Sequence, residues 1–516
     1  MVDLPPYSSL TFGLVAAETE AMRTPDLLLE GFLDPGNWIR RIETGDAFLV
    51  LGVKGSGKSA IIEHLRLKHA DDPSVFVTKC ELDDLSLLDF ANLKTGEDPG
   101  PARTATAWKF LLLIRLFESL DHDQAAQRAL GPDLDSLRRT LQQLGLYRVG
   151  PRRIGWLLSR STIKFDLRGL GASMDFERGS LHLVQVVDLL TRLLQGLNIP
   201  TTHYLAIDGL DDSFAGSDAE WHALGALVDA VTALTRDLQL SPTQLRIVLL
   251  CRTDMFDRLP SANSNKRRSD SSILVQWHPS GESRTTTPLF DMATRKARVS
   301  CPEIQDVFSD YFPRDIDVKR PPGRRRETKK YLTDYTRFTP RDILTLMNAI
   351  ARQASPSRPL ADQHVRDGAT TYSTDYFVGE ILNNFAGYIS PARTDQFISV
   401  LGSMHSQEFT YPYVESVLTK NFDWSSQEVR ETMLHAYQVG AVGERFRRDG
   451  VAYTNFSYRN SNAQTLLGGM LVLQTALARG LNRPGVGHGA LRDDTGSIPL
   501  DLRRSRARPR RPRSGP

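Results

Sequence analysis

The chain has 516 residues, of which 40% are hydrophobic and 24% are charged, and its net charge is +3. These values are ordinary for a soluble protein of about two to four domains. The three cysteines (Cys80, Cys251 and Cys301) show neither disulfide nor metal-ligand spacing, so we expect buried free thiols. The chain has no signal-peptide pattern and no apolar helix of membrane length, which excludes a membrane partner and predicts a cytoplasmic protein.

Residues 1–45 are predicted as a lead-in segment of loops and short helices, and Phe48–Leu51 as the first buried strand. Directly after that strand, residues 52–59 read Gly-Val-Lys-Gly-Ser-Gly-Lys-Ser, which fits the phosphate-binding pattern G-x-x-x-x-G-K-[ST]. Such a loop needs glycines because its backbone N–H groups approach phosphate oxygens closely. The sequence therefore predicts binding of a nucleoside triphosphate.

Each polar residue of this loop has an expected role. Lys58 would place a charge on the β- and γ-phosphates, and the Ser59 hydroxyl would ligate Mg²⁺. The helix that begins near Ser59 adds its positive dipole end to the same site. The residues expected to bind the nucleotide here are Gly52, Gly55, Ser56, Gly57, Lys58 and Ser59.

Strands alternate with helices in the segment that follows. Strands are predicted over 74–80, 202–208, 245–251 and 272–277, and helices over 106–120, 124–145, 151–160, 181–197 and 218–238. This alternation predicts an α/β fold, a parallel sheet with helices on both faces. We expect a P-loop ATPase core over 46–285, with a large helical insertion at about 82–180.

The strand over 202–208 ends in Asp208-Gly209-Leu210-Asp211-Asp212. Asp208 is placed to hold Mg²⁺ through water beside Ser59. Asp211 or Asp212 would orient and deprotonate the attacking water. The alternative is a polar turn after a buried strand.

Three groups of basic residues are candidates for contact with the γ-phosphate. Arg252 lies where the fourth strand ends and would report whether the γ-phosphate is present. The alternative explanation for an arginine there is the ordinary polarity of a strand end. Arg341, after Pro340, could close onto the nucleotide from a helical lid over 286–372, although Pro340 is also ordinary helix capping. Lys266–Arg268 could act as an arginine finger in a neighbouring subunit, although we favour a solvated loop there.

The remaining sequence predicts a winged-helix-like domain over 373–481 and a basic, disordered tail over 482–516. Its helices are predicted over 376–389, 393–404, 411–419 and 425–437, and its two strands over 441–446 and 451–456. Asp449-Gly450 between the strands is a strong hairpin signal. His435, on a helix face, is expected to be structural.

The phosphate loop, the Asp208–Asp212 motif and Cys251-Arg252-Thr253 resemble the ASCE class of P-loop ATPases. They are most similar to its STAND group, the NACHT and KAP ATPases, and Pro340-Arg341 resembles the second sensor of AAA+ lids. The resemblance covers roughly residues 45–475 and implies ATP and Mg²⁺ as cofactors. It also implies the order of ATPase core, helical lid and winged helix.

Two functions follow from these observations. The first is a regulatory ATPase switch, in which ATP draws lid and winged helix onto the core and hydrolysis releases them. The resemblance implies stress or phage-defence signalling, with a homo-oligomer or an effector protein in trans as partner. Lys266–Arg268 would join subunits in the ATP state.

The alternative is a DNA-binding ATPase that resembles the origin-recognition AAA+ proteins. The would-be recognition helix carries Glu428 and Glu431 against one Arg430, which suits phosphates poorly. Arginines of the wing and the tail could still hold a duplex; the wing arginines are Arg445, Arg447 and Arg448. A small-molecule kinase is less favoured, because no acceptor pocket is legible in the sequence.

Overall fold

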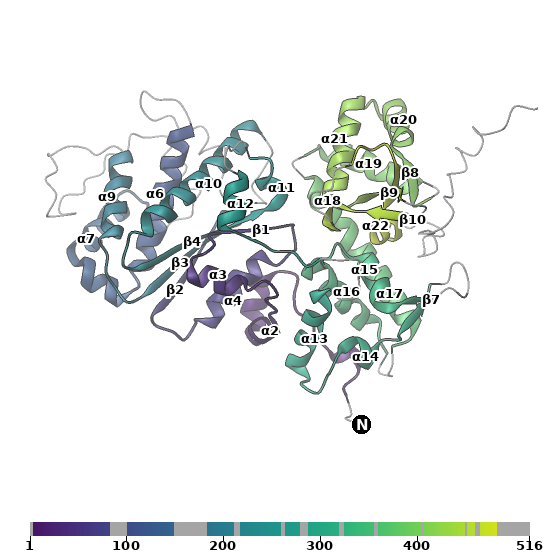
Figure 1. Cartoon of the computed structure of the whole chain (residues 1–516), viewed down its shortest axis with the longest axis horizontal. Helices are drawn as coiled ribbons and strands as arrows, with labels where there is room; N and C mark the ends of the chain where they lie inside the picture. The colour runs from purple at the N-terminus through teal and green to yellow at the C-terminus, as the bar shows by residue number, and fades with distance from the viewer. Residues whose placement is uncertain are drawn as a thin grey trace, which may run out of the picture. The chain divides into compact units, whose positions relative to one another are not determined.

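The computed structural model of the protein shows two compact units. The described residues are 4–82, 101–148, 183–210, 217–259, 264–278, 287–318, 323, 325–355, 360–386, 388–404, 406–448, 451–459 and 465–481. We call residues 16–29 and 34–276 the sheet unit, and residues 1–15, 30–33 and 277–516 the helical unit. Figure 1 labels many of the elements of both.

A five-stranded parallel sheet forms the centre of the sheet unit, in the order β2-β3-β4-β1-β5. Its strands are β1 (Leu49–Gly52), β2 (Val75–Glu81), β3 (Thr202–Asp208), β4 (Gln244–Arg252) and β5 (Ser272–Leu274). All five predicted strands are confirmed, but β5 ends at Leu274 instead of residue 277. The edge strand β5 pairs with β1 only, and the paired register ends at Leu51 and Leu274.

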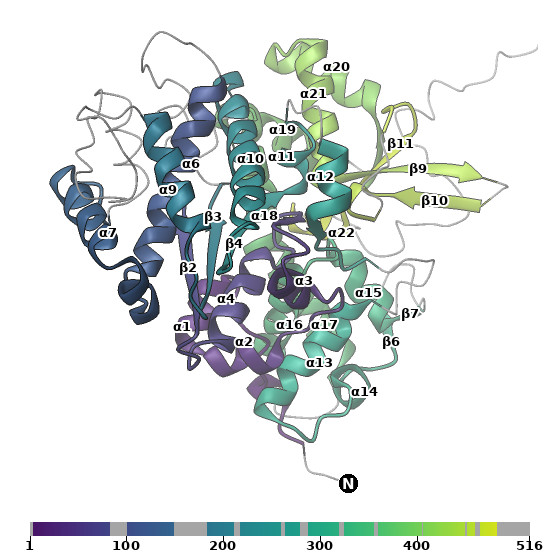
Figure 2. The same ribbon diagram turned by 60° about the vertical axis from the view of Figure 1, so that its left-hand side comes forward.

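Helices cover both faces of this sheet, as predicted. The helices described for this unit are α1 (Ala17–Arg23), α2 (Pro25–Gly31), α3 (Trp38–Thr44), α4 (Lys58–Lys68), α6 (Pro101–Leu120), α7 (Gln124–Gln143), α9 (Leu183–Gln195), α10 (Asp218–Leu238), α11 (Thr253–Phe256) and α12 (Ser264–Ser271). Leu49 and Leu51 join one buried cluster with α6, α9 and α10. Because side chains alternate along a strand, Val50 faces the other side, where α3 and α4 lie (Figures 1 and 2).

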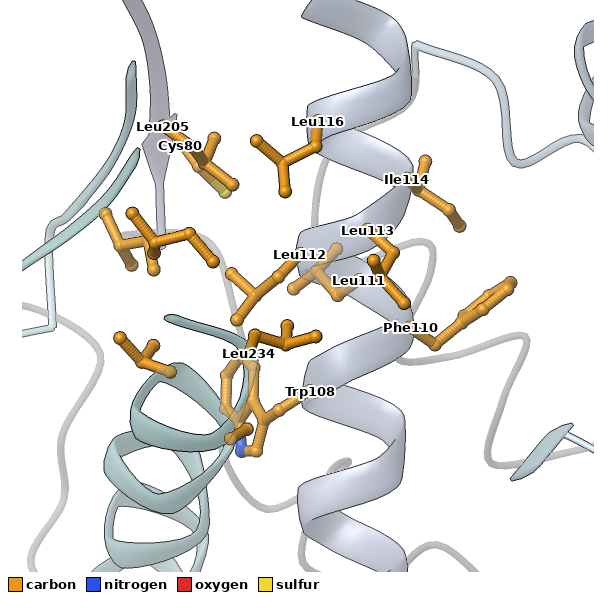
Figure 3. Close-up of a cluster of buried hydrophobic side chains, with 14 of the residues drawn as sticks. Cys80, Trp108, Phe110, Leu111, Leu112, Leu113, Ile114, Leu116, Leu205 and Leu234 are labelled. Atoms are coloured by element: carbon orange, nitrogen blue, oxygen red, sulfur yellow. The ribbon is translucent and has the colours of Figure 1, made fainter. Parts of the chain in front are cut away.

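Helix α6 supplies much of the apolar core, as Figure 3 shows. Its side chains face Cys80 of β2 and Leu205 of β3, and Leu234 of α10 belongs to the same buried cluster. The Trp108 indole donates a hydrogen bond to the Ala223 carbonyl at 3.0 Å. The segment expected as an insertion therefore contributes α6 to the core of the sheet. The helix predicted over 151–160 lies outside the described residues.

A buried polar network surrounds His203 at the start of β3. His203 Nδ1 lies 2.9 Å from Ser119 Oγ, and Nε2 lies 3.3 Å from Asp123 Oδ2. Thr201 donates to the same carboxylate oxygen at 2.6 Å. Burial lowers the pKa of His203, and the contact with Asp123 opposes this effect only in part.

This environment predicts a loss of stability in mild acid. The unfolded chain takes up a proton below about pH 6.5, whereas buried His203 resists protonation. The contribution of His203 is therefore complete above that pH and is lost as the pH falls toward the lowered pKa of the folded state. Urea unfolding from about pH 7.5 to about pH 5.5 should show a steeper loss for the wild type than for His203→Gln. Equal slopes would contradict the prediction.

The first half of the helical unit contains η1 (Tyr7–Ser9), α13 (Pro288–Ser300), α14 (Val307–Tyr311), β6 (Asp315–Asp317), β7 (Arg325–Glu327), α15 (Thr328–Tyr335), α16 (Pro340–Gln353) and α17 (Asp362–Tyr372). The predicted helical pattern is confirmed here, and the small antiparallel pair β6–β7 interrupts it. Tyr7, which is 1% exposed, packs its ring against those of Phe12 and Tyr311. The first part of the lead-in segment, up to residue 15, thus completes this core.

The C-terminal part contains η2 (Ser373–Phe377), α18 (Val378–Phe385), α19 (Pro391–Ser403), β8 (Glu408–Thr410), α20 (Tyr411–Phe422), α21 (Ser426–Gln438), β9 (Val442–Arg448), β10 (Val451–Asn455), η3 (Ser457–Arg459), β11 (Met470–Leu473) and α22 (Thr475–Gly480). The predicted hairpin is confirmed as β9–β10. The short strands β8 and β11 extend it to an antiparallel sheet in the order β10-β9-β11-β8.

His435 of α21 is structural, as expected. It is buried, its Nε2 lies 2.7 Å from the Asn384 carbonyl, and its ring stacks on Tyr388. All three cysteines are buried thiols, which confirms that expectation as well. Among the residues that the structure describes, no helix combines the length and the apolar character needed to cross a membrane.

Candidate nucleotide-binding site

The glycine-rich loop connects β1 to α4 at the carboxyl edge of the sheet. Gly55 and Gly57 have φ values of 80° and 96°, which side chains with a Cβ rarely adopt. A Cβ on Gly52 would lie 2.3 Å from Ser56 Oγ, so this position also requires glycine. The strand, loop and helix that the motif requires are therefore present, and each motif glycine has a local steric reason.

Lys58 opens α4 and bends back across the loop. Its Nζ donates to the carbonyl oxygens of Gly52 at 3.1 Å and Val53 at 3.3 Å. These carbonyls hold the ammonium over the loop. Ser56, in the middle of the loop, is only 1% exposed.

Ser59 and Asp208 meet at the start of α4. The Ser59 hydroxyl donates to Asp208 Oδ2 at 2.6 Å, and the Gly209 N–H donates to Asp208 Oδ1 at 2.9 Å. Asp208 ends β3, two strands away from β1 in the sheet. A hydroxyl and a carboxylate are oxygen donors of the kind that Mg²⁺ prefers, since this ion takes only one or two protein carboxylates and completes its shell with water and phosphate.

Lys79 of β2 also lies at this edge, and sequence reasoning missed it. Its Nζ is 3.8 Å from Asp208 Oδ2 and forms closer ion pairs with Glu18 at 2.8 Å and Glu81 at 3.0 Å. Burial disfavours the charge on Lys79, but the contacts with Glu18 and Glu81 outweigh it and raise the pKa of the ammonium. A lone lysine in an apolar strand was the only available signal.

Arg252 ends β4 and stands opposite Gly52 in the paired register. Its guanidinium makes a bidentate ion pair with Asp254, at 3.0 Å from Nε and 2.7 Å from Nη2. The predicted arginine is therefore brought to the edge that carries the phosphate loop, and its side chain is held there by a carboxylate. The other predicted carboxylates, Asp211 and Asp212, lie outside the described residues.

Arg341 belongs to the helical unit, so its contact with a nucleotide stays a prediction. It lies in the first turn of α16, and its Nη1 is 3.6 Å from Glu380. Nearby, buried Arg337 makes a bidentate pair with Asp342 and lies 3.8 Å from the same Glu380. Burial opposes ionisation, but Asp342 raises the pKa of Arg337 above its ordinary value.

The basic group Lys266–Arg268 lies on helix α12, so the expectation of a loop there was wrong. Arg267 pairs with Asp229 at 2.6 Å, and Arg268 pairs with Asp257 at 2.7 Å. These ion pairs to α10 and to the end of α11 hold the helix against its own unit. The polar composition of 264–271 concealed a helix because it lacks an apolar stripe.

The strand order, the glycine loop after β1 and the helix α4 define an α/β protein with a P-loop NTPase-like fold. No protein-family model and no curated protein matches the sequence. Solved structures that match include a crystal structure of Cdc6p from Pyrobaculum aerophilum, at 10% identity over 92% of this chain and 97% of that chain, with a TM-score of 0.25. A score this low carries no argument, so the fold rests on the sheet and the loop.

Proposed function

We propose that the chain binds ATP together with Mg²⁺ and hydrolyses it. The hydrogen bond between Ser59 and Asp208 carries this proposal: the two residues are 149 positions apart, yet their side-chain oxygens lie 2.6 Å from each other. A glycine-rich turn without a ligand has no need for a carboxylate at that hydroxyl. The paired oxygens fit a metal that accompanies phosphate.

The chain's own residues divide the work of binding. The loop N–H groups and the N-terminus of α4 bind phosphate oxygens. Lys58 exchanges its two carbonyl partners for the β- and γ-phosphates, and Ser59 and Asp208 hold the metal side. When bound, Mg²⁺ would neutralise charge on the transferred phosphoryl group. Asp211 or Asp212 orients and deprotonates water, and Arg252 contacts the γ-phosphate.

Phosphate release by the purified full chain tests hydrolysis directly. We expect turnover with ATP and Mg²⁺ and none when EDTA removes the metal. Binding of a fluorescent ATP analogue is measured in parallel. Absence of both binding and turnover in the folded protein would overturn the proposal.

The pairing of Arg252 with Asp254 makes a further prediction. If Arg252 must leave a carboxylate to reach the γ-phosphate, Asp254→Asn should raise the affinity for ATP relative to ADP by about threefold to tenfold. Competition of ATP and ADP against a fluorescent nucleotide measures this ratio. Asp257→Asn, which removes a nearby carboxylate that pairs with Arg268 instead, is the matched control. An unchanged ratio in Asp254→Asn would contradict a sensing role for Arg252.

We further propose that hydrolysis resets a conformational switch of the STAND type. One strand, β4, lies between the phosphate-loop strand and the Asp208 strand, which supports the ASCE class. Arg341 of the lid would join the nucleotide in the ATP state, and a homo-oligomer or an effector protein in trans would read that state in the cytoplasm. Stress or phage-defence signalling is the role that the family resemblance implies.

Size measurement with ADP and with a non-hydrolysable ATP analogue tests the switch. A larger species with the analogue alone would support assembly. The same size with both nucleotides would count against it, while leaving hydrolysis untouched.

DNA binding through a winged helix and the tail over 482–516 remains the second candidate. An exposed aromatic pair on the hairpin favours it: Phe446 and Tyr453 are 47% and 43% exposed and stack at 5.7 Å, and aromatic rings bind bases. Against it, Arg445 forms an ion pair with buried Glu408. Retardation of duplex DNA by the protein with and without residues 482–516, measured over a range of salt concentrations, decides between DNA binding and the switch.

A further inference from the structure

Lys79 is a cation at the candidate metal edge that no predicted motif contains. Within 4 Å of its Nζ lie carboxylate oxygens from four elements of the sheet unit. They belong to Glu18 of α1 at 2.8 Å, Glu81 of β2 at 3.0 Å, Glu63 of α4 at 3.4 Å and Asp208 of β3 at 3.8 Å. Its side chain is 14% exposed, so these contacts are only partly screened by water.

The position of the ammonium matters more than its number of partners. Asp208 Oδ2, which lies 3.8 Å from Lys79, is the same oxygen that accepts the Ser59 hydroxyl. A cation and a hydroxyl therefore share the oxygen that would face the metal. Glu63 has a second partner, Arg66 at 2.9 Å, whereas the ion pairs that the structure describes for Glu18 and Glu81 are with Lys79.

Carboxylate oxygens gathered in this way attract divalent cations. The Lys79 charge opposes that attraction, because like charges a few ångströms apart repel strongly where water is scarce. Nucleotide phosphates add negative charge to the other side of the site.

We propose that Lys79 is a positioning residue that keeps Mg²⁺ from binding at Asp208 until nucleotide phosphates are present. The inference rests on the proposed function, because it concerns the same metal site. It adds a regulation to that site: the metal enters with the nucleotide and not before it. Glu18 and Glu81 bind the ammonium more closely than Asp208 does, and so fix its distance from Asp208.

Metal binding without nucleotide tests this directly. Wild-type protein, Lys79→Met and Lys79→Arg are titrated with MgCl₂ by calorimetry and with Mn²⁺ by electron paramagnetic resonance. We expect Lys79→Met to bind the metal alone about tenfold more tightly than wild type, whereas Lys79→Arg keeps the charge and stays close to wild type. Lys68→Met, which removes a lysine paired with Glu43 at 2.6 Å, is the matched control and should also behave as wild type.

The double variant Lys79→Met/Asp208→Asn locates the metal. The double variant should lose the metal affinity that Lys79→Met gained. If it keeps that affinity, the metal binds elsewhere and the inference is overturned. An unchanged metal affinity in Lys79→Met overturns the inference as well. If wild type fails to bind ATP with Mg²⁺ while Lys79→Met gains metal affinity, the proposed function fails and the electrostatic role stands. If wild type binds ATP with Mg²⁺ and Lys79→Met gains nothing, only the inference fails.

The side chain of Glu63 is 6% exposed, and replacing Lys79 removes one of its two ion pairs and leaves the one with Arg66. Because this change can destabilise the fold, circular dichroism must first show that Lys79→Met is folded. Glu18→Gln provides a second test that removes no buried cation. Without Glu18 the ammonium has one fewer partner drawing it from Asp208, and the site loses a negative charge. The Mg²⁺ concentration for half-maximal nucleotide binding should rise about threefold; an unchanged value would overturn the inference.

Discussion

The Lys58→Met variant is expected to lose ATP turnover by about 10²–10³-fold. The ammonium is held over the loop by the carbonyls of Gly52 and Val53, and on nucleotide binding it would exchange these partners for phosphate oxygens. In the proposed reaction its charge would stabilise the β- and γ-phosphates in the ground state and more strongly in the transition state. Steady-state phosphate release measures the loss, and a fluorescent nucleotide measures the accompanying fall in affinity.

Lys54→Met is the matched control, because Lys54 lies in the same loop at a position where the motif accepts any residue. Turnover in this variant should stay within a few-fold of wild type. Comparable losses in both variants would mean that the loop acts through its total charge. That result would contradict a specific role for Lys58.

The fold of the sheet unit could be predicted because each strand carries a local signal. β3 and β4 each contain a continuous apolar run (204–207 and 247–251) of the kind that a sheet buried on both faces requires. The loop could be predicted for a similar reason, since Gly52, Gly55 and Gly57 each meet a steric demand that only glycine satisfies. At these positions the residue type that the local sequence supplies is the one that the fold requires.

The meeting of Ser59 with Asp208 could be predicted as well, because both follow from strand ends at one edge of a parallel sheet. Lys79 could not. Its four partners come from α1, α4, β2 and β3, and nothing in the sequence around residue 79 indicates that these elements converge there. Ion-pair networks depend on tertiary contacts that a linear pattern does not carry.

The arginines show the same limit in another form. Arg252 was correctly placed at the end of a strand, but its bidentate partner Asp254 was not foreseen. In the helical unit, buried Arg337 pairs with Asp342 in the interior. Arg341, four residues later, was the arginine predicted to contact the nucleotide, because Pro340-Arg341 resembles the second sensor of AAA+ lids. Pattern alone does not distinguish a buried structural arginine from one that binds a ligand.

The base of the proposed reaction is tested by Asp212→Asn and Asp211→Asn. Whichever residue deprotonates water, its replacement should lower turnover by about 10²–10⁴-fold while nucleotide affinity stays within a few-fold of wild type. Binding persists because the phosphate loop, Ser59 and Asp208 are intact. Single-turnover phosphate release, with binding measured on the same samples, separates the two effects.

Asp218→Asn is the control for this pair, because Asp218 is an exposed carboxylate in the first turn of α10, shortly after the motif. Its turnover should match wild type. If both Asp211→Asn and Asp212→Asn keep full turnover, the base lies outside the Asp208–Asp212 motif. Glu81 would then be the residue to replace next, because it is the last residue of β2 and is paired with Asp208 of β3 in the register of the sheet.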